Sequence, residues 1–158
     1  MDKKKILMKV LIIYIAFVFI QSLFFKFTGS PETEHIFSTL DIWANDTFGI
    51  EGLFLASGIF NAYVIGSAEL VASILLLTGM VSSQKILVPL GALMAMGIIS
   101  GAIIFHLFTP LGIEVLGDGG TLFYMACGIW ISALILLIMH KKVLLGLCCG
   151  CCELSCQK

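Results

Sequence analysis

The chain has 158 residues, of which 59% are hydrophobic and only 12% are charged. Soluble domains of this size are about half apolar and about one quarter charged. With a mean hydropathy of +1.10, the chain has too few polar groups to cover its apolar surface. Its formal net charge is -1, so no basic face indicates a nucleic-acid partner. The composition therefore predicts an integral membrane protein whose partner is the lipid bilayer.

Four apolar runs approach the roughly 20 residues that a helix needs to cross a bilayer. Lysines precede the first run, as in a secretory signal, but the run continues through Phe25 without a small-residue cleavage site. We therefore interpret it as a helix that stays in the chain. The sequence predicts an all-α fold, a four-helix transmembrane bundle. The expected spans are residues 6–25, 61–80, 86–108 and 122–139.

The placement of lysine predicts the orientation of the bundle. With four spans both chain ends share one side, and every lysine except Lys26 falls on that side. Lysine excess marks the cytoplasmic side of a membrane protein. We expect a multi-pass protein of an inner or plasma membrane with both termini cytoplasmic. Residues 1–142 are expected to form the membrane domain, and residues 143–158 a cysteine-rich cytoplasmic tail.

The first connection on the outer side is expected to form a helix. Ser30 is a suitable N-cap, Pro31 suits the first helical position, and Glu32 places an acid in the first turn. An amphipathic helix here suits the lipid headgroup level, either as a lid packed on the bundle or as a gate over a cavity. Residues 48–60 then approach along the outer surface or begin the second span early. The apolar positions are Ile36, Phe37, Leu40 and Trp43, opposite Glu34, Ser38 and Asp41.

The last outer connection contains a short acidic and glycine-rich motif. Glu114 is followed by Asp118, Gly119 and Gly120, and no cation is adjacent in the sequence. Glycine allows positive φ, and both Asp118 and Thr121 suit the capping of the next helix. Turn chemistry accounts for most of this motif.

Small residues recur in the spans at spacings that let helices approach closely. The third span contains Gly97 and Gly101, a small-xxx-small pair, and Gly66 and Gly128 offer similar positions in the second and fourth. In a bilayer such residues support helix packing, because lipid removes the usual hydrophobic drive. We expect a compact bundle, and the same positions suit the face of a homo-oligomer.

The segment GSAELVASILLLTG places Glu69 inside an otherwise apolar run. A charge at the centre of a span costs about 2.5–3.5 kcal/mol on insertion scales, so Glu69 should face the bundle interior. Gln21, Lys26, Asn61 and His106 all fall toward the outer side, where together with Glu69 they are expected to line one polar cavity. Two interpretations stay open, a network that fixes helix register and a site for a ligand or proton.

The tail contains two overlapping C-x-x-C spacings. The cytoplasmic side is reducing, so structural disulfides are not expected there. Thiolates at this spacing suit soft metals such as Zn or Cu(I), whereas acylation, redox sensing or an inert interfacial tail are the alternatives. The candidate metal ligands are Cys148, Cys149, Cys151 and Cys152.

Three segments, FFKFTGSPE, GSAELVASILLLTG and GAIIFHLFTPLGIEVLGDGG, resemble the DoxX family of small membrane proteins in matching order over roughly residues 20–125. The resemblance implies a four-helix membrane bundle. Relatives in that family include subunits associated with thiosulfate and quinone redox chemistry, partners of thiol-handling enzymes and, more distantly, receptor-assembly chaperones.

No catalytic residue is predicted, because the chain has no G-x-S-x-G, P-loop or H-E-x-x-H motif. With the resemblance, this favours an accessory subunit over a stand-alone enzyme. The expected function is in redox or thiol homeostasis, in contact with a quinone, a sulfur species or a membrane or peripheral redox protein. The alternatives are a non-catalytic assembly factor for membrane proteins and a small transporter or metal handler.

Overall fold

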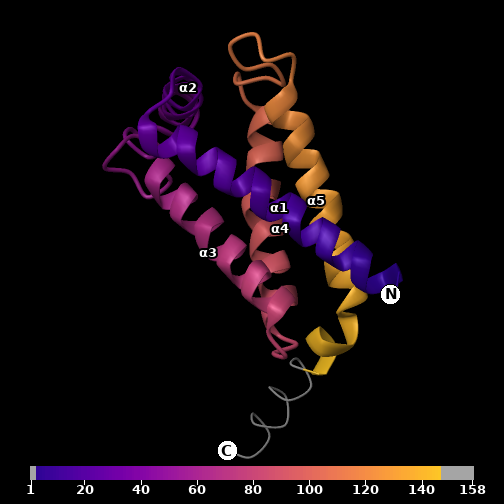
Figure 1. Ribbon diagram of the computed structural model, residues 1–158. Helices are drawn as coiled ribbons and strands as arrows, with labels where there is room; N and C mark the ends of the chain where they lie inside the picture. The colour runs from indigo at the N-terminus through magenta and orange to yellow at the C-terminus, as the bar shows by residue number, and fades with distance from the viewer. Residues whose placement is uncertain (1–2, 147–158) are drawn as a thin grey trace, which may run out of the picture.

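A computed structural model describes residues 3–146, and within this range all regular structure is helical (Figure 1). The four cysteines predicted to bind metal lie outside the described residues. The helices are α1 (Lys3–Thr28), α2 (Pro31–Phe48), α3 (Ala62–Val81), α4 (Leu87–Phe108) and α5 (Thr121–Met139).

All of these helices except α2 are long and apolar enough to cross a membrane, which confirms the predicted all-α architecture with four candidate spans. Helix α1 packs against α3, α3 against α4, and α4 against α5, while α1 also contacts α5. Large apolar side chains cover the outside of the bundle; Phe17 is 63% exposed and Phe24 is 69% exposed. A multi-pass membrane protein needs such a surface, because lipid covers it.

The main core lies between the four long helices and depends on small residues at the crossings. A Cβ built on Gly66 of α3 meets Phe27 of α1 at 3.0 Å, and one built on Gly91 of α4 meets Leu76 of α3 at 2.9 Å. Close approach at these points therefore requires glycine. The buried side chains that these crossings enclose include Ile12, Phe19, Leu76, Ala92 and Ile129.

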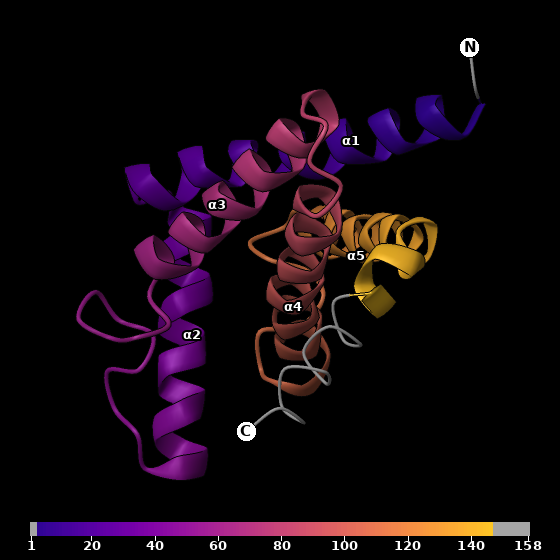
Figure 2. The ribbon, with the colours of Figure 1, turned by 90° about the horizontal axis from the view of Figure 1, so that it is seen from below.

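Helix α2 begins and ends as its sequence predicts. The Ser30 side chain accepts a hydrogen bond from the Thr33 amide, Pro31 opens the helix, and Gly49 closes it with φ +69. The helix is seen end-on in Figure 1 and side-on in Figure 2. Its axis therefore runs across the bundle, at the end that we call the α2 end.

One expectation about α2 is wrong. The sequence pattern puts Asp41 opposite the apolar positions of the helix, but the residue is only 6% exposed. Its carboxylate accepts hydrogen bonds from the backbone amides of Gly52 (3.2 Å) and Phe54 (3.0 Å). The reason is that the chain returns over α2 after the helix ends, and its buried amides need an acceptor. Of residues 48–60, Phe48 still ends α2 and the rest approach α3 as a loop, and α3 begins only after its N-cap, Asn61.

A second, smaller core joins α2 to the rest of the α2 end. The Phe105 ring of α4 lies 5.4 Å from the Phe54 ring and 6.2 Å from the Trp43 ring. Helix α2 and the loop after it are thus packed on the end of the bundle as a lid. The buried residues of this second core are Leu40, Ala44, Phe54, Leu111 and Val115.

Candidate functional site

The structure brings Lys26 of α1 to Glu69 of α3. The Lys26 Nζ atom lies 2.9 Å from Glu69 Oε1 and 2.8 Å from Oε2. Ser22, one helical turn before Lys26, donates its hydroxyl hydrogen to Glu69 Oε2 at 2.6 Å and accepts a hydrogen bond from Lys26 Nζ at 2.5 Å. The three side chains form a closed ring of charge-assisted hydrogen bonds, which we call the ion cluster.

The ion cluster is largely enclosed. The side chain of Glu69 is 6% exposed and that of Lys26 is 16% exposed. All three ammonium hydrogens have an acceptor, and among the described residues no buried side-chain nitrogen or oxygen lacks a partner. An ion pair in a medium of low dielectric constant is stable only when its remaining donors and acceptors are satisfied. This cluster meets that condition.

Close packing around the ion cluster explains how α1 and α3 come near enough. Gly66, one turn before Glu69, lies against Leu23 and Phe27 of α1. The Phe27 ring stacks on Tyr63 with centroids 5.8 Å apart. Apolar contacts on one side of the pair thus exclude lipid and water, which strengthens the electrostatic attraction inside.

The other residues expected near Glu69 lie elsewhere. Gln21 is exposed on α1, because it is about 100° around the helix from Ser22. Asn61 caps α3 by accepting from the Val64 amide at 2.9 Å. Ser22, which takes the place expected for Gln21, was missed by sequence reasoning. Its position four residues before Lys26 was the signal that could have found it.

His106, at the end of α4, belongs to a different environment. The side chain is 7% exposed, and its Nδ1 atom lies 2.6 Å from the Gly112 carbonyl oxygen. The Phe123 ring packs edge-on against it with centroids 5.7 Å apart. The imidazole thereby ties the end of α4 to the loop that follows.

Asp118 organises that loop. Its carboxylate accepts hydrogen bonds from the backbone amides of Val115 and Gly120 on Oδ1, and from Leu122 on Oδ2. Burial alone would raise the pKa of Asp118, but these three amides and the nearby His106 together hold the pKa below its ordinary value.

The N-cap of α5 differs in part from the prediction. Gly120, with φ +78, occupies the cap position itself, whereas Asp118 supplies the capping side chain, since its Oδ2 accepts the Leu122 amide in the first turn of α5. Glu114, the other acid of the motif, is exposed, as is Gly119. The motif thus acts mainly through the Asp118 carboxylate.

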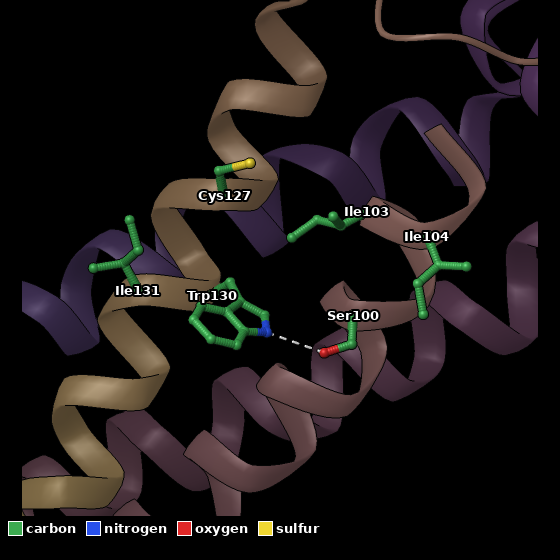
Figure 3. Close-up of a pocket in the computed structure, with 6 residues that line it drawn as sticks. All are labelled: Ser100, Ile103, Ile104, Cys127, Trp130 and Ile131. Atoms are coloured by element: carbon green, nitrogen blue, oxygen red, sulfur yellow. Dashed lines mark hydrogen bonds between the residues drawn. The ribbon is translucent and has the colours of Figure 1, made fainter. Parts of the chain in front are cut away.

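A groove that the sequence did not predict lies between α4 and α5 (Figure 3). Its volume is about 530 Å³, and the Trp130 Nε1–H donates to Ser100 Oγ at 3.1 Å across it. The lining is otherwise apolar. The residues on its walls are Ser100, Ile103, Ile104, Cys127, Trp130 and Ile131.

These features define a multi-pass helical membrane protein with a buried ion pair between two of its helices, Lys26 of α1 and Glu69 of α3. Within residues 3–146 no group of three or more His, Cys, Asp or Glu side chains could hold a metal ion. No protein-family model, curated protein or solved structure matches the chain.

Proposed function

We propose that this chain is a DoxX-like membrane accessory protein whose ion cluster binds a polar group of a lipophilic ligand, of which a quinone is the leading candidate. The observation that carries the proposal is the Lys26–Glu69 pair itself. Its two members are 43 residues apart in sequence, and each lies in one of the segments that resemble the DoxX family. Because these two segments meet at one charged contact, we infer that both contribute to a single ligand-binding site.

The chemistry of the ion cluster suits a carbonyl or hydroxyl group. A hydroxyl group can donate to a remaining lone pair of the Glu69 carboxylate, and a carbonyl oxygen can accept from the Lys26 ammonium in place of Ser22 Oγ. The exposed fraction of Lys26, 16%, gives such a group a point of approach. A charged pair inside a span is costly, and such pairs often mark ligand sites or proton paths.

The proposed placement in the membrane follows the lysine pattern. The two chain ends lie on the cytoplasmic side, and the α2 end lies on the outer side of an inner or plasma membrane. Helix α2, which lies across the bundle (Figure 2), then rests as an amphipathic helix at the headgroup level. A redox enzyme, in the membrane or peripheral to it, is the proposed partner.

Native mass spectrometry of the protein in its own lipids tests the proposal. Wild type is compared with Glu69→Gln and Lys26→Met, and Gln21→Ala on the same helix serves as the matched control. We expect a bound small molecule in the wild type and the control that is lost from both site variants. A ligand that persists in Glu69→Gln, or an empty bundle in every sample, would falsify this role.

A second function, a non-catalytic assembly factor, is favoured by the open side of α4. A Cβ built on Gly97 or Gly101 meets nothing within 4 Å, so a client helix can approach there. Co-purification of an unassembled membrane protein, lost in Gly101→Leu, supports this role. The metal-handling alternative depends on the tail cysteines, outside the described residues.

A further inference from the structure

The two nitrogens of the His106 ring are in different situations. Nδ1 faces the Gly112 carbonyl oxygen at 2.6 Å. A carbonyl oxygen accepts hydrogen bonds but cannot donate one, so Nδ1 carries the hydrogen of this contact. In the neutral imidazole the other nitrogen, Nε2, then holds a lone pair.

The Nε2 atom is accessible even though the ring is buried. The side chain as a whole is 7% exposed, and within residues 3–146 the ring makes its hydrogen bond through Nδ1 alone. Every fully buried side-chain nitrogen or oxygen among the described residues has a partner. Nε2 has no partner among the described residues, so it is not fully buried and must lie where the ring reaches the surface.

The groups around His106 determine which ligand charge is favoured beside its ring. Asp118 is close enough to interact electrostatically with the ring, and its carboxylate is held in place by three backbone amides. His106 also lies in the last turn of α4, where the helix dipole adds partial negative charge. Both effects repel anions.

We propose that His106 Nε2 is a binding site for a neutral hydroxyl group, which donates its hydrogen to the lone pair. The site lies at the α2 end and makes no hydrogen bond to the ion cluster, so it is a second recognition point. Carboxylates, phosphates and anionic sulfur species are excluded from it by charge. The edge-on Phe123 ring provides an apolar wall for the carbon skeleton of the hydroxyl compound.

Nuclear magnetic resonance of the full chain in phospholipid nanodiscs, with 15N-labelled histidine, tests the proposal directly. Signals of His106 are identified by their loss in His106→Asn. At alkaline pH we expect Nδ1 to be protonated and Nε2 to be unprotonated. A protonated Nε2 in the neutral ring overturns the proposal.

Titration with phenol, and with benzoate as an anion of similar size, then tests the selectivity. We expect phenol to shift the His106 Nε2 signal at a concentration at least tenfold below that at which benzoate has the same effect. No response to phenol, or an equal response to both, means that only water occupies the position, and the proposal fails.

Two variants separate binding from loop structure. In His106→Asn the side-chain amide reaches the position of Nδ1, so it keeps a donor for Gly112 but removes Nε2. In His106→Gln the amide reaches the position of Nε2 instead. Saturation transfer from protein to phenol should fall severalfold in His106→Asn and should be partly retained in His106→Gln. If the His106→Asn variant folds and saturation transfer to phenol is undiminished, the proposal is contradicted. If this variant does not fold, the titration of the wild type with phenol and benzoate decides alone.

Discussion

Two helix–helix interfaces of the bundle, which we call the α1–α3 seam and the α4–α5 seam, differ in how closely their helices pack. The α1–α3 seam is closed by the ion cluster of Ser22, Lys26 and Glu69, and Gly66 fits tightly against the facing helix. Between residues 87–108 of α4 and 121–139 of α5, as the structure describes them, one side-chain hydrogen bond crosses the seam, from Trp130 to Ser100. Beside that bond a groove of about 530 Å³ stays open.

Of these two seams, the one that encloses a charge is the one that is closed. Lipid covers an apolar groove at little cost, because the drive to bury apolar surface is absent there. An unpaired charge cannot be left to lipid in the same way. The α1–α3 seam is therefore closed where the chain must satisfy a charge, whereas the α4–α5 seam can leave a groove to lipid.

The largest effect is expected from breaking the ion cluster. Lys26→Met removes the ammonium and leaves the Glu69 carboxylate buried without its partner, which should lower the free energy of unfolding by about 3–5 kcal/mol. The double variant Lys26→Met/Glu69→Leu should recover most of this loss. Denaturant unfolding in mixed micelles, followed by circular dichroism, measures both.

Gln21→Leu, on the exposed side of α1, is the control for this experiment. It should change the free energy of unfolding by less than about 0.5 kcal/mol. A Lys26→Met variant as stable as this control would mean that the charged pair does not hold the α1–α3 seam together.

Glycines on the two sides of α4 are expected to differ by the next largest amount. A Cβ at Gly91 meets the Leu76 side chain at 2.9 Å and the Ala72 carbonyl oxygen at 3.1 Å, whereas one at Gly101 meets nothing within 4 Å. Gly91→Ala should therefore destabilise the bundle by about 1–3 kcal/mol. Gly101→Ala should be neutral, or slightly stabilising through its helix propensity.

Unfolding of both alanine variants in the same micelles measures this difference. An equal loss in Gly101→Ala would show that the open side of α4 is covered in solution. Sedimentation of wild type and variant would then identify a second copy of the chain as the cover, as the spacing of Gly97 and Gly101 allows.

A smaller effect is expected from Asp118. Its pKa in the folded protein lies below the ordinary value of 3.8, so its stabilising contribution is present above that pH and is lost as the pH falls through the folded value. Asp118→Asn should cost about 1 kcal/mol at neutral pH and should remove this acid-dependent loss. Hydrogen exchange at the Val115, Gly120 and Leu122 amides, compared between wild type and variant, reports it; matching acid profiles would contradict this role.

The sequence predicted the spans, the cap of α2 and the inward placement of Glu69, because each depends on a strong local signal: length, capping chemistry or the cost of a charge. Apart from the side of the second span that carries Glu69, it did not predict which side of a span faces inward. Each span is apolar nearly all round, so its periodicity does not fix the rotation of the helix. Periodicity therefore did not separate Ser22 from Gln21, although the four-residue spacing of Ser22 and Lys26 could have done so, and it gave no indication of the α4–α5 groove. Asp41 was misplaced because its acceptor role depends on a loop that returns from later in the chain.

The smallest effect is expected at the open seam. Trp130→Phe keeps the aromatic ring but removes the Nε1–H that donates to Ser100. Hydrogen bonds between membrane helices contribute about 0.6 kcal/mol on average, so the free energy of unfolding should fall by about that amount. Ser100→Ala should give the same loss, and the double variant should add nothing further, because both changes remove one bond. A loss of several kcal/mol would mean instead that the Trp130–Ser100 bond holds α4 and α5 together, and the contrast between the two seams would disappear.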